Sequence, residues 1–132
     1  MTDAPEINIP EVVAEVRAAF DRYDRGLDEN DVAVLNDSFW DNAETLRYGV
    51  TENLYGHAAI AGFRAARTPA QQQARARRLE NTRITSFGRD FAVANTEYVI
   101  LSTGKRGRQS QTWTRMPEGW KVVAAHVSML AD

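Results

Sequence analysis

The C-terminal end of the chain contains two candidate strands, residues 109–116 and 120–129, separated by Pro117-Glu118-Gly119. Proline presets the backbone for a turn and glycine can take a positive φ, so the pattern predicts antiparallel strands joined by a tight turn. Alternate residues of a strand share a face, which groups Trp120, Val122, Ala124, His126 and Ser128. A face that passes from large apolar to polar side chains predicts the wall of a pocket. The alternative is a core histidine satisfied by a neighbouring group.

The rest of the chain predicts helices first and strands later. Apolar residues recur at helical spacing from Pro10 to Leu27, and shorter helices are expected over 32–39 and from His57 until Pro69. A short strand is expected over 45–48, a loop over 49–56, and further strands over 77–87 and 91–102. This order predicts an α+β fold with three helices on one face of a curved, mainly antiparallel sheet, whose open mouth is a natural ligand site.

Length and composition limit the classes of protein. The 132 residues predict one domain spanning 1–132, with residues 1–9 as a flexible arm that lacks the apolar core of a secretory signal. The net charge of -2 and the lack of long apolar runs predict neither nucleic-acid nor membrane partners. No cysteine is present and no two histidines have ligand spacing, so we expect no metal site and a cytoplasmic location.

Tyr23 and Arg47 are the main candidates for chemistry. Tyr23 lies on the apolar stripe of the first helix, where a buried phenol needs a polar partner, in the core or in a ligand. Arg47 alternates with apolar residues of the short strand, which favours a position facing the cavity, where a guanidinium requires an anion. That anion is either a ligand or a carboxylate of Glu44, Glu52 or Glu97, and plain surface exposure is a further alternative.

The other candidates depend on position. Gln109, Gln111 and Trp113 share a strand face that suits a ureido or carboxylate ligand, or an interface between subunits. Arg64 faces either the mouth of the cone or solvent. The basic residues Arg75, Arg77, Arg78 and Arg83 are interpreted as the solvated start of a strand, because they lack the interleaved aromatic residues of a nucleic-acid site.

The order of elements and the segment from Trp113 through Gly119-Trp120 to His126-Val127-Ser128 resemble the nuclear-transport-factor-2-like superfamily, which includes ketosteroid isomerase and SnoaL-type cyclases. Residues 46–56 and 107–113 more closely resemble AtzH/HpxZ-type proteins, which accompany amidohydrolases of cyanuric acid and oxalurate breakdown. The resemblance covers essentially the whole chain and implies the cone-shaped fold. The fold by itself assigns no function, because it hosts enzymes, binding modules and assembly domains.

The resemblance to AtzH implies a cofactor-free decarboxylase of N-carboxylated ureas such as 1,3-dicarboxyurea, acting in cyanuric acid and s-triazine catabolism. Tyr23 is the expected proton donor, as ketosteroid isomerase also presents a tyrosine from its first helix. Arg47 is expected to bind the dianionic ureido substrate, together with a second set of residues: Gln111, Trp113, His126, Ser128 and Arg64. The alternatives are a non-catalytic, carboxylate-binding partner of an amidohydrolase and a purely structural dimer.

A homodimer through the sheet is also expected. The helices cover only one face of the strands, and the other face is predicted to carry Val123, Val127 and Met129. Burial of such a face across a two-fold axis is a common outcome.

Overall fold

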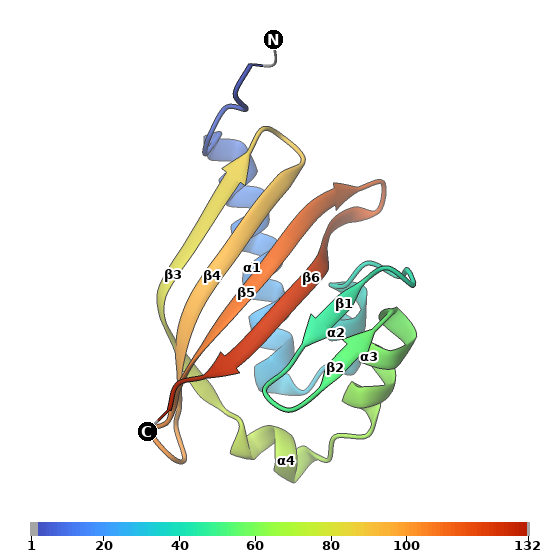
Figure 1. Cartoon of the computed structure of the whole chain (residues 1–132), viewed down its shortest axis with the longest axis vertical. Coiled ribbons are helices and arrows are strands. Elements are labelled where there is room, and N and C mark those ends of the chain that lie inside the picture. Colours follow the sequence, from blue (N-terminus) through green and yellow to red (C-terminus); the bar gives the residue numbers. More distant parts are fainter. Residues whose placement is uncertain (1–2, 132) are drawn as a thin grey trace.

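The computed structural model describes residues 3–131 and confirms the α+β class (Figure 1). The helices are α1 (Pro10–Glu29), α2 (Val32–Asp37), α3 (His57–Ala65) and α4 (Pro69–Ala74). The strands are β1 (Leu46–Tyr48), β2 (Asn53–Tyr55), β3 (Arg77–Phe87), β4 (Phe91–Ile100), β5 (Arg106–Met116) and β6 (Gly119–Met129).

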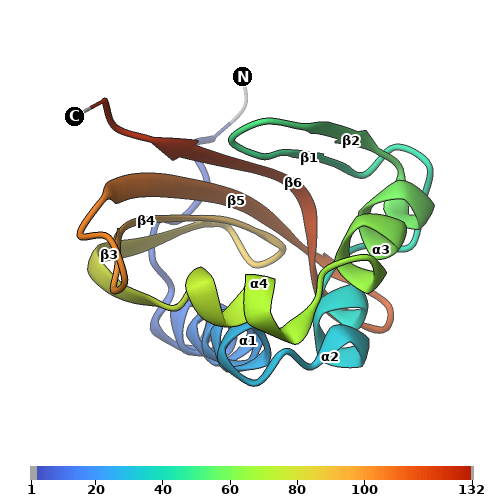
Figure 2. The ribbon, with the colours of Figure 1, turned by 90° about the horizontal axis from the view of Figure 1, so that it is seen from below.

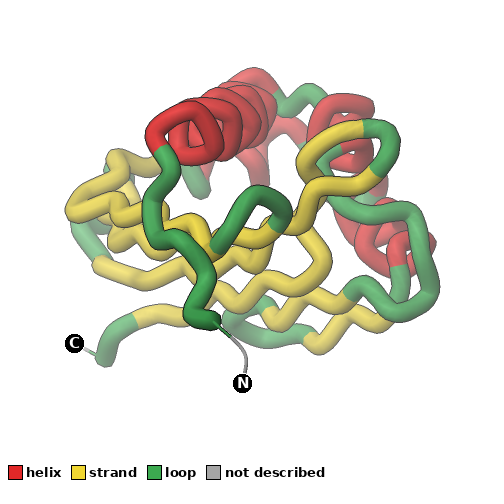
Figure 3. The backbone as a smooth tube through the Cα atoms, turned by 90° about the horizontal axis from the view of Figure 1, so that it is seen from above, coloured by secondary structure: helices red, strands yellow, loops and turns green. Residues whose placement is uncertain are grey.

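All six strands form one sheet in the order β2-β1-β6-β5-β4-β3. The strands β3 to β6 are an antiparallel meander, as expected, whereas β1 pairs in parallel with β6. Seen from below, the sheet curls over α1, with α3 at one side and α4 in front (Figure 2). The helices thus gather on the concave face of the strand layer, as the tube view also shows (Figure 3).

The long helix α1 supplies the floor of the cone. Pro10 suits its first turn, and its buried residues recur at helical spacing: Val12, Val16, Phe20, Tyr23 and Gly26. The apolar side chains of this stripe share one core with Trp113 on β5. Asn30 ends the helix in the left-handed conformation. None of the helices within residues 3–131 is both long and apolar enough to cross a bilayer.

Two elements differ from the expectation for residues 49–76. Residues 53–55, expected in a loop, form β2, because they pair antiparallel with β1 across a short turn. Pro69, expected only to stop a helix, begins α4, in which Thr68 and Gln71 form a capping box. The preceding helix α3 already ends at Ala65. Of these two additions, α4 borders the cavity described below.

The expected single face on β6 is wrong, because a β-bulge interrupts the alternation. Thr112 pairs with Ala124 but Trp113 pairs with Val122, which leaves Val123 as the extra residue. Val122 is fully buried, and beyond the bulge Val127 is buried too, while His126 is exposed. Val127 therefore faces the helices, whereas the sequence predicted it on the outward face of the sheet, at a dimer interface.

Residues 6–9, which were expected to belong to a flexible arm, contact the body of the fold. The backbone N–H of Gly88 donates to the carbonyl of Glu6, and Asn8 exchanges hydrogen bonds with Ser86 on β3. Ile9 is buried in the core. Residues 1 and 2 of the expected arm lie outside the described residues.

Candidate functional site

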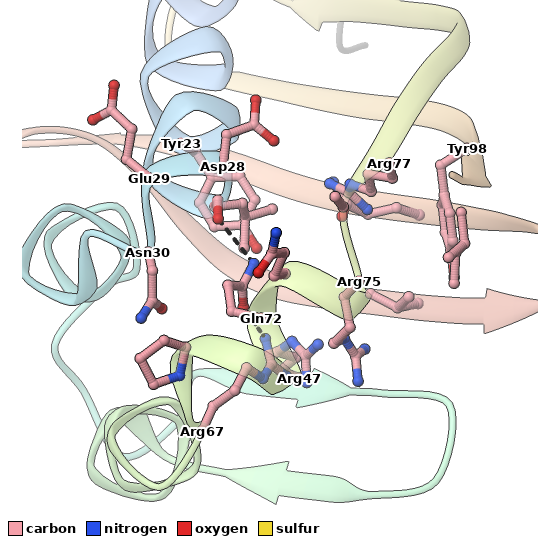
Figure 4. A pocket seen from close by; sticks show the side chains of 17 residues that line it. Tyr23, Asp28, Glu29, Asn30, Arg47, Arg67, Gln72, Arg75, Arg77 and Tyr98 are labelled. Atoms are coloured by element: carbon pink, nitrogen blue, oxygen red, sulfur yellow. Dashed lines mark hydrogen bonds between the residues drawn. The ribbon is translucent and has the colours of Figure 1, made fainter. Parts of the chain in front are cut away.

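A cavity of about 380 Å³ lies between the end of α1, the helix α4 and the concave face of the sheet (Figure 4). Its polar lining consists mainly of hydrogen-bond donors, and those that carry the argument are Tyr23, Arg47, Arg67, Arg75, Arg77 and Gln109. Tyr23, Arg47 and Arg67 also line a smaller hollow beside Arg64. Two of the sequence candidates, Tyr23 and Arg47, therefore meet at one cavity.

Tyr23 is placed by the buried stripe of α1 and is only 4% exposed. Its ring packs against Phe39, with centroids 5.9 Å apart. One turn further along α1, Leu27 lines the same cavity. The packing fixes the ring, so the phenol is presented to the cavity from a rigid helix rather than from a loop.

Arg47 is placed by β1, where it lies between Leu54 of β2 and Ala125 of β6. It is 8% exposed, and its Nη1 donates to Oε1 of Glu52 at 2.9 Å. The structure thus selects Glu52 among the three possible carboxylate partners, while Arg47 also lines the cavity. The ion pair and the ligand-facing position were expected as alternatives, and the geometry combines them.

Glu52 is held tightly in the turn between β1 and β2. Thr51 donates to it from its hydroxyl and its backbone N–H, and the carboxylate lies so close to Gly49 that a Cβ there would overlap it. Burial alone would raise the pKa of Glu52, but the hydrogen bonds from Thr51 and Arg47 together hold it below the usual value. Glu52 therefore stays ionised and orients Arg47.

Arg67 lies in the segment that follows α3, and it lines the cavity near Arg47 (Figure 4). Its Nη1 donates to Oε1 of Gln72 at 2.9 Å, and Nε2 of Gln72 donates to the carbonyl of Leu27 at 2.8 Å, which ties α4 to α1 (Figure 4). Burial, with repulsion from Arg75 and Arg47, lowers the pKa of Arg67 to about 10. The guanidinium is still charged at neutral pH, so an anion bound here would offset the repulsion.

Arg64 is buried, not exposed to solvent. Its guanidinium lies 4.3 Å from the centroid of the Phe39 ring and donates to the carbonyl of Leu35 and to Asn36. Burial lowers its pKa, and the neighbouring Tyr23 opposes this shift. Arg64 therefore lines the smaller hollow beside Tyr23 and does not line the main cavity.

The glutamines of β5 occupy different depths of the cone. Gln109 lines the cavity, whereas Gln111 lies deeper and accepts a hydrogen bond from Nε1 of Trp113 at 3.2 Å. Both amides are almost fully buried, and Nε2 of each has no hydrogen-bond partner among residues 3–131. The sequence left open whether this face meets a ligand or another subunit; in the structure it points inward, with Gln109 in the cavity wall and with Gln111 and Trp113 buried outside the cavity lining.

Two residues of the basic cluster belong to the site, which sequence reasoning missed. Arg75 and Arg77 line the cavity, while Arg78 and Arg83 are exposed on β3. Arg77 follows the alternation of β3 inward, and that alternation was the available signal. The interpretation of the cluster as a solvated start of a strand is therefore wrong for Arg77, and it is incomplete for Arg75, which borders the cavity from an exposed position.

His126 and Ser128 lie on the convex side of β6 because of the bulge. The exposed ring of His126 packs edge-on against Tyr48, 5.6 Å between centroids, and neither His126 nor Ser128 lines the cavity. Their expected contact with a ligand is therefore not supported by their position.

The charges of the cavity are unevenly distributed. Arg47, Arg67, Arg75 and Arg77 line it, against Asp28 and Glu29, which are exposed at the end of α1. Within residues 3–131, no group of three or more His, Asp or Glu side chains forms a metal-binding cluster. The site is therefore suited to a small anion with oxygen acceptors, bound by guanidinium and amide donors.

This fold, a cone of helices and curved sheet with a polar cavity at its mouth, is that of nuclear-transport-factor-2-like proteins. A superfamily member from Salmonella enterica serovar Typhimurium LT2 is 25% identical, with a TM-score of 0.72 and coverage of 92% of this chain and 93% of that one. The AtzH-like family model matches residues 5–132, so the chain belongs to the AtzH-like family.

Two solved structures are more similar in sequence. A protein of unknown function from the DUF3225 family of Pectobacterium atrosepticum SCRI1043 is 51% identical, with a TM-score of 0.90 and 95% coverage of each chain. A cystatin-like fold protein from Burkholderia xenovorans LB400 is 45% identical, with a TM-score of 0.88 and coverage of 97% of this chain and 98% of that one. No curated protein matches the chain.

Proposed function

We propose that this protein binds a small dianionic N-carboxylated urea, of the 1,3-dicarboxyurea type, and catalyses loss of CO2 from one of its N-carboxylates. The observation that carries the proposal is the convergence of Tyr23 and several guanidinium groups on one cavity whose polar lining is mostly donors. Membership of the AtzH-like family supports the same substrate class.

In the proposed reaction the bond between nitrogen and the carboxylate carbon breaks. Its electron pair stays on nitrogen, partly delocalised onto the urea carbonyl, and CO2 leaves. The Tyr23 phenol protonates that nitrogen and the phenolate takes a proton from solvent, so each turnover consumes one proton and yields CO2 and a urea with one carboxylate fewer. No cofactor is required, because the urea carbonyl accepts the electron density.

Arg47 binds the non-reacting carboxylate or the urea oxygen. An arginine clamped on the reacting carboxylate would stabilise the ground state and slow its departure as neutral CO2. The Glu52 carboxylate, 2.9 Å from Nη1 of Arg47, keeps the guanidinium in one orientation. This division of roles assigns proton donation to α1 and anchoring to β1.

The test compares CO2 release from 1,3-dicarboxyurea by wild-type protein with the spontaneous rate. The Tyr23→Phe variant retains the ring that packs against Phe39 and should lose on the order of 10²-fold in turnover, with little change in substrate binding. Arg47→Ala should reduce both turnover and substrate binding. Arg47→Lys should restore little of either, because an ammonium lacks the bidentate hydrogen-bond geometry of a guanidinium. Wild-type rates in both variants would overturn the proposed site. Wild-type protein that binds substrate but leaves the spontaneous rate unchanged would favour a non-catalytic accessory role.

A further inference from the structure

The wall of the cavity across from Arg47 contains a second set of donors with no assigned role. Arg47 comes from β1 and Arg77 from β3, which are four positions apart in the sheet. Both line the same cavity, because the sheet curls and carries the two guanidinium groups toward each other (Figures 2 and 4). The cavity therefore has basic groups from two strands that lie far apart in the strand order, β1 and β3.

The Arg77 guanidinium packs against an aromatic ring, but not all of its N–H groups have hydrogen-bond partners. Its side chain is 12% exposed, and its guanidinium lies 5.1 Å from the centroid of the Tyr98 ring. The nearest carboxylate oxygen, on Asp24, is 3.5 Å from Nη2, and neither Nε nor Nη2 has a hydrogen-bond partner within residues 3–131. Two donors of a largely buried arginine are thus left unsatisfied, which is costly unless a ligand accepts them.

Gln109 adds an independent observation on the strand β5. It is 3% exposed, it lines the cavity, and its Nε2 has no hydrogen-bond partner in the described chain. Buried amide groups are nearly always hydrogen-bonded in native proteins. A ligand oxygen is the acceptor that would satisfy both Gln109 and Arg77.

We infer that Arg77 and Gln109 form a second carboxylate subsite, so that the cavity selects linear dianions that reach from Arg47 to Arg77 over monoanions of the same length. The inference rests on the proposed function, whose substrate carries two terminal carboxylates, and it assigns the residues that bind the second one. Tyr98 acts as a positioning residue, because its ring supports the plane of the Arg77 guanidinium.

Glutarate and pentanoate are suitable probes, since both have five carbons and they differ in one carboxylate. Calorimetric titration of the wild-type protein should show glutarate binding at least 10-fold more tightly. Arg77→Met should remove most of this preference by weakening glutarate and leaving pentanoate nearly unchanged. Arg78→Met is the matched control, because the adjacent arginine is exposed on the other face of β3 and should preserve the preference.

Gln109→Glu provides a second variant that keeps the shape of the side chain and replaces the donor by a negative charge. This variant should reduce the affinity for glutarate by more than 10-fold and the affinity for pentanoate by less. The subsite is overturned if wild-type protein shows no preference for glutarate, or if folded Arg77→Met and Gln109→Glu variants keep it. CO2 release by the wild-type protein is measured separately, so a failed subsite with intact CO2 release leaves the proposed function standing.

Discussion

Replacement of Glu52 by glutamine tests whether Arg47 presents its charge to a ligand. The side chains of Arg47 and Glu52 are 10% and 19% exposed, and the introduced amide would keep an oxygen that accepts from Nη1. Because the charge is lost but the hydrogen bond remains, we expect Glu52→Gln to reduce the free energy of unfolding by about 1–3 kcal/mol. The Thr51 hydroxyl can rotate toward water, whereas its backbone N–H loses the carboxylate acceptor, and this loss is part of the expected destabilisation.

The same substitution should strengthen anion binding. A carboxylate that shares one guanidinium with a bound anion repels that anion by an amount on the order of 2 kcal/mol at an effective dielectric constant of about 20. Solvent screens part of this repulsion, so removal of the Glu52 charge should raise the affinity for glutarate roughly 5- to 20-fold at low ionic strength.

The assay pairs urea denaturation with calorimetric titration of glutarate. Glu44→Gln is the matched control: it removes the same charge from an exposed position nearby and should change neither quantity appreciably. Lower stability together with higher affinity is the expected result. Unchanged or weaker glutarate binding by folded Glu52→Gln protein would refute the view that Glu52 competes with a ligand for Arg47.

Three further outcomes are expected. The folded state holds the pKa of Glu52 below its ordinary value of 4.5, so just below that pH the folded protein binds fewer protons than the unfolded chain. The resulting stabilisation is complete above pH 4.5 and is lost on acidification. Urea denaturation at pH 7 and pH 3 should therefore show a smaller loss of unfolding free energy for Glu52→Gln than for wild type. Gly107→Ala should displace the Tyr98 ring and the backbone carbonyl of Ser128, both of which a Cβ would overlap, and should weaken glutarate binding more than pentanoate binding by calorimetry. Phe91, exposed beside Phe87 on the convex face, should lie in a homodimer interface, so sedimentation of Phe91→Glu at micromolar concentration should give half the mass found for wild type, and equal masses would contradict this.

Much of the fold was predictable because its signals are local. The buried stripe of α1 and the turns between β3, β4, β5 and β6 are visible in the sequence as helical spacing and as Gly or Pro positions. The strand β2 was not predicted, because three residues form a strand only through pairing with β1. The helix α4 was missed because Pro69 was interpreted as a stop, although proline also suits the first turn of a helix.

The candidate site was predictable only in part. Tyr23 and Arg47 follow from the inward faces of their elements, but the position of His126 depends on one extra residue, Val123, that shifts the pleat of β6. No local signal of the sequence marks that bulge. The role of Arg77 depends on the curl of the sheet, which brings β3 and β1 to one cavity and is a property of the whole domain.

The parallel pairing of β1 with β6 has a consequence for how the protein folds. Only three residue pairs join the two strands, and they connect positions 46–48 with positions 124–126. Contacts of such long sequence separation form late, since the loop between them must be ordered first. The antiparallel meander can form from neighbours in the chain, but Arg47 reaches the cavity only after the last strand is in place. We therefore expect the cavity to be completed late in folding, and local opening of β1 together with β2 would remove the anchor while leaving β3 to β6 paired.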